Sequence, residues 1–149
     1  PLSNWCDFFR EKRLQPQIDL AKRQELLSAQ LLSSFEKLYK KLPDIFPTEA
    51  MSLLHGDLWS GNFLCGEAAT PVLIDPAVYY GHRSMDLAMT TLFGGFDQRF
   101  YEAYAHWYPL PANYAEQWEV CNLYPLLIHL NLFGQGYLSS IAAALRRFR

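Results

Sequence analysis

Hydrophobic residues recur at the spacing of an α-helix from the first residues of the chain onward. The pattern over residues 3–22 predicts a helix, and either Ser3 or Asn4 could cap its first turn. Pro16 lies inside this pattern and is expected to interrupt the helix, because proline lacks a backbone N–H and its ring clashes with the preceding turn.

A stronger helical pattern covers residues 24–41, where apolar residues follow one another at steps of mostly three and four. Pro43 and Pro47 come directly after this stretch. We expect the two prolines to end the second helix and to lead the chain into a loop.

Shorter apolar runs in the middle of the chain predict β-strands instead of helices. The first run covers residues 51–55 and precedes a glycine-containing polar loop at 56–61. Residues 62–65 and 72–74 form two further runs that are separated by a turn at 66–71. This arrangement is typical of a small β-hairpin.

After Pro76 the pattern becomes helical and remains so to the end of the chain. Gly94 and Gly95 are expected to close the first of these helices, and Pro125 predicts a kink or a break in the longest. The predicted helices cover residues 84–93, 97–108, 113–133 and 139–149. The expected fold is therefore mainly α with a small β-hairpin (α+β), in one compact unit of 149 residues.

Composition and charge exclude several classes of protein. Half of the residues are hydrophobic, so the chain is not intrinsically disordered. The net charge is −2, which argues against a general nucleic-acid binder. The aromatic content is high, with 10 Phe, 9 Tyr and 4 Trp. Such rings fill a core and also form flat walls against which a ligand can stack.

Three widely spaced cysteines, Cys6, Cys65 and Cys121, form no C-x-x-C pair. This spacing disfavours a zinc ribbon or a disulfide scaffold and favours buried or half-buried free thiols in the reducing cytoplasm. No apolar run of about 18 residues is present, so we expect no membrane span.

The segment Leu53-Leu-His-Gly-Asp-Leu-Trp-Ser-Gly-Asn-Phe63 contains the most informative chemistry in the chain. It brings Asp57 and Asn62 into one tight loop, and Asp75 follows at the end of the next hairpin. Phosphoryl transfer needs a carboxylate for the proton of the attacking hydroxyl, and it needs oxygen ligands that hold magnesium against the nucleotide phosphates. Gly56 and Gly61 would allow backbone angles that other residues disfavour.

Two other interpretations of this segment are weaker. A polar turn between two strands would explain an isolated Asp-x-x-x-x-Asn, but not the preceding His-Gly or the second aspartate at hairpin distance. A metallohydrolase that uses His55 and Asp57 as metal ligands would need further His or Glu residues, which the segment lacks.

On these motifs the chain resembles the kinases of the aminoglycoside phosphotransferase superfamily, and most of all the fructosamine (ketosamine) kinases. The broad part of the match is His-Gly-Asp with the asparagine of the same loop. The narrower parts are the tryptophan in the loop and Asp75-Pro-Ala with the aromatic pair and Gly-His-Arg83 after it. The segment Leu92-Phe-Gly-Gly-Phe96 also matches. The resemblance implies the carboxy-terminal lobe of a protein-kinase-like fold.

The resemblance also implies a role for each matching residue. Asp57 would be the catalytic base, and Asn62 with Asp75 would bind the magnesium that accompanies ATP. His55 would brace the loop, and Asp86 would accept hydrogen bonds from its backbone. The residues that would border the substrate are Trp59, Tyr79, Tyr80 and His82.

Two neighbouring positions need separate comment. Arg83 could border the substrate or form a structural ion pair. The family commonly has an acidic residue where this chain has Ser84, which could still cap the following helix. The change would remove a carboxylate from the metal side of the site.

A kinase of this type also needs an amino-terminal lobe with a glycine-rich loop and a strand lysine. The lysines of this chain lie on predicted helices, and its one Gly-x-Gly, Gly134-Gln-Gly136, lacks the third glycine of a phosphate cradle. We therefore expect the chain alone to be inactive and to expose an apolar surface through which it could self-associate.

The resemblance implies a glycated amine or protein as substrate and neither nucleic acid nor membrane as partner. Two alternatives stay open at this point. The chain could belong to another small-molecule kinase, of the aminoglycoside or choline type, or it could be a non-catalytic interaction module derived from a kinase lobe.

Overall fold

The computed structural model describes residues 4–149 and confirms a mainly helical fold with small antiparallel β elements. The chain divides into two compact units. One combines the residues up to Glu49 with Asn122–Arg149, and the other is the continuous segment Ala50–Cys121. The two units are described separately below.

The first unit opens with helix α1, Trp5–Phe8, whose first turn is capped by the Asn4 side chain. Ser3 lies outside the described residues. A π-helical turn, Phe9–Leu14, leads directly into α2, Gln15–Arg23, so the prediction that Pro16 interrupts the helix is wrong. The wider π-helical turn, in which Gln15 N–H donates to the Arg10 carbonyl, provides the room that the proline ring needs.

Helix α3, Ala29–Ile45, starts at a Ser28 cap and runs through Pro43, which was expected to end it. Proline removes one N–H from the hydrogen-bond ladder, but here it does so only in the last turn. Leu42 and Ile45 are buried on either side of it, and their burial offsets the loss of one hydrogen bond.

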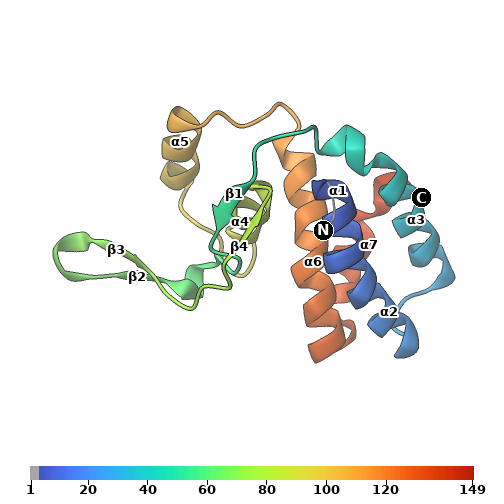
Figure 1. The fold of residues 1–149 in the computed structure, drawn as a ribbon. Helices are drawn as coiled ribbons and strands as arrows, with labels where there is room; N and C mark the ends of the chain where they lie inside the picture. Colours follow the sequence, from blue (N-terminus) through green and yellow to red (C-terminus); the bar gives the residue numbers. More distant parts are fainter. Residues whose placement is uncertain (1–3) are drawn as a thin grey trace. The chain divides into compact units, whose positions relative to one another are not determined.

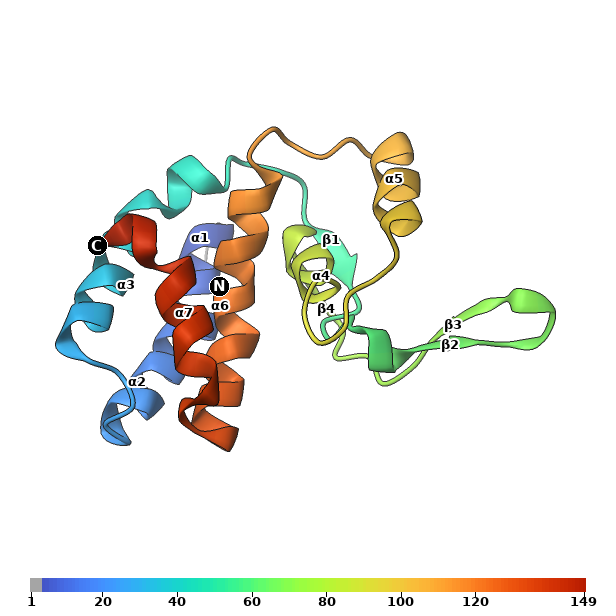
Figure 2. The same ribbon diagram turned by 180° about the vertical axis from the view of Figure 1, so that it is seen from behind.

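The core of the first unit forms where the amino-terminal helices meet α7, Leu138–Ala144, and the part of α6, Tyr114–Phe133, that follows Asn122. Figures 1 and 2 show α1, α2 and α7 beside α6. The hydrophobic residues of this unit that are exposed by at most 1% are Phe9, Leu14, Ala21, Phe35, Leu38, Leu42, Leu123, Leu127, Leu130, Ile141 and Leu145. Helix α6 continues past Pro125, so the break allowed at that position does not occur.

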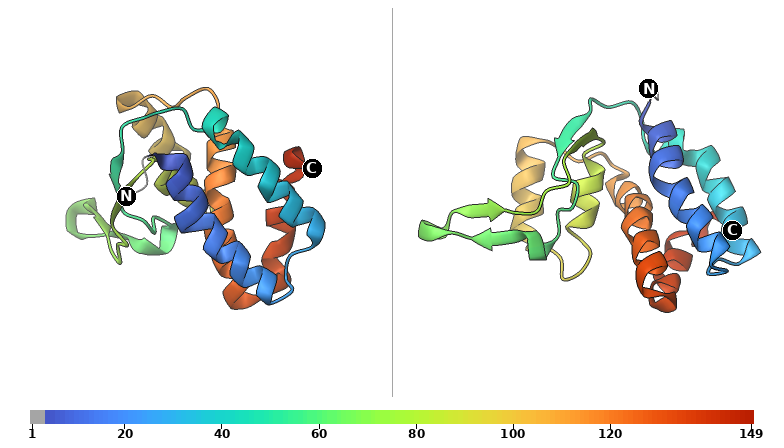
Figure 3. Two further views of the ribbon diagram at one scale, coloured as in Figure 1. Left: turned by 45° about the vertical axis from the view of Figure 1, so that its right-hand side comes forward. Right: turned by 60° about the horizontal axis from the view of Figure 1, so that its bottom comes forward.

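The second unit contains two small antiparallel sheets. Strands β2, Phe63–Cys65, and β3, Pro71–Leu73, form the predicted hairpin, which Figure 3 shows as two adjacent arrows. Strand β1, Ser52–Leu54, pairs with β4, Tyr79–Gly81. The pattern did not predict β4, because a three-residue strand gains its stability from a partner far away in the sequence.

The helical segments not yet described follow β4 in the chain. Helix α4, Ser84–Met89, is shorter than predicted and is followed by a left-handed turn at Phe93, Gly94 and Gly95. Helix α5, Gln98–Trp107, starts at an Asp97 cap. After α7 a short 3-10 turn, Arg146–Phe148, ends the described chain. No helix of residues 4–149 is both long enough and apolar enough to cross a membrane.

The three cysteines differ in exposure, and this difference predicts their reactivity. Cys121 is buried, Cys6 is half-buried and Cys65, which was expected to be at least half-buried, is exposed at the end of β2. Burial raises the pKa of the Cys121 and Cys6 thiols, which lowers the thiolate fraction that reacts with alkylating reagents.

We expect native labelling with iodoacetamide to modify Cys65 first, Cys6 more slowly and Cys121 only after unfolding. Peptide mass spectrometry over a time course would measure the order. Labelling in urea provides the control, because all three thiols should then react at similar rates. Fast native labelling of Cys121 would contradict the packing described here.

Candidate functional site

A single carboxylate anchors the loop that follows β1. The Asp86 side chain, from helix α4, accepts a hydrogen bond from His55 N–H at 2.6 Å and another from Gly56 N–H at 2.9 Å. Gly56 has a φ of +84°, and a Cβ at this position would lie 2.1 Å from the Ala77 carbonyl oxygen. The residue must therefore be glycine both for its backbone angle and for the close approach of the chain.

Burial raises the pKa of Asp86, although the two backbone N–H groups oppose this shift by stabilising the charged form. The carboxylate is thus taken out of water to serve two specific donors.

His55 connects this loop to the end of the β2–β3 hairpin. Its Nε2 lies 3.0 Å from the carbonyl oxygen of Ile74, and its Nδ1 lies 3.3 Å from the backbone nitrogen of Asp57. These distances fit an arrangement in which Nδ1 accepts from Asp57 N–H and Nε2 donates to the Ile74 carbonyl. Both ring nitrogens are occupied by backbone partners, which suits a bracing role.

Asp57 and Asn62 face each other across the loop. The Asn62 side-chain nitrogen donates to the Asp57 carbonyl oxygen at 2.9 Å and to Asp57 Oδ2 at 3.0 Å. Asn62 is buried and Asp57 is half-buried. This double contact fixes the carboxylate and assigns the amide orientation, and Asn62 Oδ1 takes no part in it.

The backbone brings the second aspartate to the same loop. Ile74 N–H donates to the Asn62 carbonyl at 3.0 Å, and the next residue is Asp75. Asp75 is exposed and has a φ of +51°. One amide oxygen and one carboxylate suit magnesium, which takes few protein oxygens when nucleotide phosphates supply others. Among residues 4–149 no three His, Cys, Asp or Glu side chains gather to hold a metal by themselves.

A model of the fructosamine kinase family matches residues 1–148 of this sequence. The chain belongs to the fructosamine kinase family. The fold agrees, because a crystal structure described as a fructosamine-3-kinase of Thermobifida fusca aligns with a TM-score of 0.90 and 34% identity. That alignment covers 99% of this chain and 52% of the other.

Curated relatives of this fructosamine kinase chain have related names. A protein described as a ketoamine kinase of Lactiplantibacillus plantarum is 47% identical over 91% of this chain and 49% of its own length. The ketosamine-3-kinase of Mus musculus is 36% identical over 92% of this chain and 44% of its own length. The chain therefore spans about half the length of these relatives.

The residues expected to border the substrate of a fructosamine kinase differ in their surroundings. Trp59 and Tyr79 are half-buried, whereas Tyr80 is 72% exposed. His82 is only 1% exposed, and its Nδ1 accepts a hydrogen bond from Ser84 N–H. The His82 ring is thus enclosed and bonded to the backbone at the start of α4, and its place beside the substrate stays a prediction.

Ser84 also has a role that the family pattern did not indicate. Its hydroxyl donates to the Gln117 side-chain oxygen at 2.7 Å, and both residues are buried. Ser84 is the first residue of α4 and does not cap it, so its side chain connects α4 to the start of α6.

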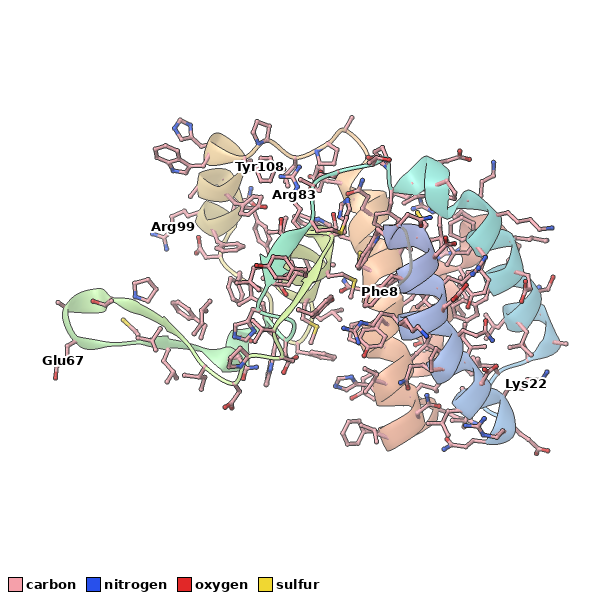
Figure 4. All side chains as sticks on the ribbon, in the orientation of Figure 1. Phe8, Lys22, Glu67, Arg83, Arg99 and Tyr108 are labelled. Carbon is pink, nitrogen blue, oxygen red and sulfur yellow. The ribbon has the colours of Figure 1, made fainter. Side chains whose placement is uncertain are left out.

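Two backbone carbonyls and one aromatic ring contact the Arg83 side chain, which Figure 4 labels together with Tyr108. The guanidinium donates to the carbonyls of Tyr108 and Pro109 at 3.2 and 2.9 Å, and it lies 3.7 Å from the centre of the Tyr108 ring. These contacts tie α4 to the end of α5, so Arg83 is occupied within the fold.

Sequence reasoning assigned Gly61 a conformational role that the structure does not support. Its backbone does not adopt a positive φ. Instead, the Trp59 ring lies so close to Gly61 that no side chain fits there. The spacing of residues in the sequence does not predict this contact. The ring of Phe93 also contacts the Trp59 indole. The sequence indicated Phe93 only as part of a family motif.

Proposed function

We propose that this chain carries the catalytic half of an ATP-dependent kinase that phosphorylates a hydroxyl of a sugar attached to an amine. The observation that supports this most directly is the hydrogen-bonded Asp57–Asn62 pair. The backbone just before Asp57 is anchored to Asp86, which accepts from His55 N–H and Gly56 N–H. A fixed carboxylate with an amide oxygen and a second aspartate nearby is the donor set that phosphoryl transfer uses.

In this proposal Asp57 accepts the proton of the attacking hydroxyl. The Asn62 amide group keeps the carboxylate oriented, because it donates to one carboxylate oxygen and leaves the other for the substrate. Asn62 Oδ1 and Asp75 would hold magnesium, which offsets the negative charge of the transferring phosphoryl group.

The substrate class follows from the aromatic wall and from the family. Trp59 lies two residues after Asp57 in the same loop, and aromatic rings stack on the apolar faces of sugars. The mouse relative is a ketosamine-3-kinase and the Arabidopsis thaliana relative is a protein-ribulosamine 3-kinase, so we infer a glycated amine or protein as acceptor.

Three free thiols suit a reducing cytoplasmic location.

The remaining contacts to ATP are assigned, in this proposal, to the half of the relatives' length that this chain does not cover. The 149 residues alone are then inactive.

The β-strands of the second unit expose several large apolar side chains that a further segment or a second copy could cover. They are Leu53, Phe63, Leu64, Val72, Leu73 and Tyr80, each at least 39% exposed.

A substrate panel tests the proposal. We expect a full-length protein that contains this sequence to phosphorylate fructosyl-lysine or ribulosyl-lysine with a kcat/KM about 100-fold or more above that for an aminoglycoside or choline. ADP release with each acceptor measures the rates, and lysine without the sugar is the control. Preferential turnover of choline or an aminoglycoside would reject the ketosamine assignment.

A further inference from the structure

The indole of Trp59 is seated directly on Gly61. A Cβ at Gly61 would lie 2.3 Å from Trp59 Cη2 and 2.4 Å from Cζ2, closer than non-bonded carbon atoms approach each other. Because the Gly61 backbone angles are open to other residues, conformational freedom does not explain the glycine. The missing side chain is what allows the six-membered ring to occupy this place.

A second segment holds the indole from another direction. The Phe93 ring meets the Trp59 ring edge-on, with centres 6.3 Å apart and planes at 90°. Ser60, the next residue after the tryptophan, donates through its hydroxyl to the Phe93 carbonyl at 3.0 Å. A hydrogen bond and a ring contact thus join the loop to a turn more than thirty residues further along the chain.

The turn that carries Phe93 is itself tightly constrained. Phe93, Gly94 and Gly95 have consecutive φ values of +52°, +110° and +67°. Phe96 N–H donates to the Thr90 carbonyl at 3.0 Å and closes the turn. A left-handed backbone is unfavourable for phenylalanine, so the conformation persists only because the surrounding contacts fix it.

We infer that Gly61 and Phe93 are positioning residues that fix the Trp59 indole before the substrate binds, and that they thereby set the affinity for the sugar-bearing acceptor. The inference rests on the proposed function, in which Trp59 stacks on the sugar. A ring that is already in place loses little conformational entropy on binding, so its contact with the sugar is used almost fully for affinity.

The test uses Gly61→Ala and Phe93→Leu in the full-length protein, each alone and combined with Trp59→Leu. We expect Gly61→Ala to raise KM for the ketosamine about tenfold and Phe93→Leu to raise it about threefold to tenfold, with kcat within about twofold. Combined with Trp59→Leu, neither change should raise KM further, because its effect passes through the absent indole.

Gly136→Ala is the matched control, since a Cβ there meets no atom within 4 Å and the residue lies outside the loop. Its KM and kcat should equal those of the unchanged protein. Thermal unfolding of every variant shows whether it is folded. Phe93→Leu keeps the test decisive if Gly61→Ala does not fold, because it changes a different contact of the indole.

Separate results overturn the inference and the proposed function. If Trp59→Leu raises KM but the other two changes leave KM unaltered, or raise it equally when combined with Trp59→Leu, the positioning role is wrong and the kinase assignment stands. If the unchanged protein does not phosphorylate the ketosamine at all, the proposed function itself fails.

Discussion

Asp57→Asn in the full-length protein is expected to reduce phosphoryl transfer by about 10³-fold or more, the upper range for loss of a general base. The substitution keeps the shape of the side chain but removes the negative charge that attracts the proton of the hydroxyl. The remaining side-chain oxygen can still accept the hydrogen bond from the Asn62 amide group, which is 3.0 Å from Asp57 Oδ2. The loop should therefore keep its structure, and the loss should appear in kcat.

Turnover of a ketosamine with saturating MgATP measures this loss. Asp44→Asn is the matched control, because it makes the same change of charge at an exposed site in α3. The control should retain full activity, and both variants should unfold at the temperature of the unchanged protein within a few degrees. An Asp57→Asn rate within tenfold of normal would reject the assignment of the base.

Local patterns predicted those parts of the fold whose stability is local. The helical patterns of the sequence predicted α3, α5 and α6, and the paired apolar runs predicted the β2–β3 hairpin. The errors concern features that depend on distant partners. Strand β4 exists because β1 pairs with it, and Pro43 stays inside a helix because its neighbours are buried against other elements.

The same distinction holds at the site. The polar residues that come together were predictable, because the loop and the hairpin bring them close along the chain. Orientation was not predictable from spacing. The ring of His82 points into the protein, and the hydroxyl of Ser84 reaches Gln117 on a helix that begins thirty residues later. The close approach of the Trp59 ring to Gly61 likewise becomes evident only in the three-dimensional structure.

Asp86→Ala is expected to have the second largest effect. It removes the carboxylate that accepts from both His55 N–H and Gly56 N–H, and each donor left without its partner costs about 1–3 kcal/mol where water cannot replace it. The loop would then no longer hold Asp57 in one place. We expect kcat for the ketosamine to fall about 100-fold in the full-length protein, while KM for the sugar changes less.

The pH dependence of unfolding separates this role from that of an ordinary surface aspartate. Burial raises the pKa of Asp86, so the folded state holds the proton more tightly than the unfolded state does. The part of the stability that depends on this pKa shift is therefore fully present below the ordinary pKa of Asp86 and is lost as the pH rises through the raised value, and the remaining contribution stays constant above it. Asp97 has the opposite sign, because its hydrogen bonds with Arg99 lower its pKa. Its contribution is present above its ordinary pKa and disappears in acid.

Urea unfolding of the unchanged protein, Asp86→Ala and Asp97→Ala between about pH 3 and pH 7 would measure both contributions. The free-energy difference between the unchanged protein and Asp86→Ala should shrink as the pH rises, whereas the difference for Asp97→Ala should grow. If the two free-energy differences changed with pH in the same direction and by the same amount, Asp86 would not be held in a desolvated site. Because Asp86 must be ionised to accept from both His55 N–H and Gly56 N–H, the stability lost on ionising it is the cost of holding the loop after β1 in place.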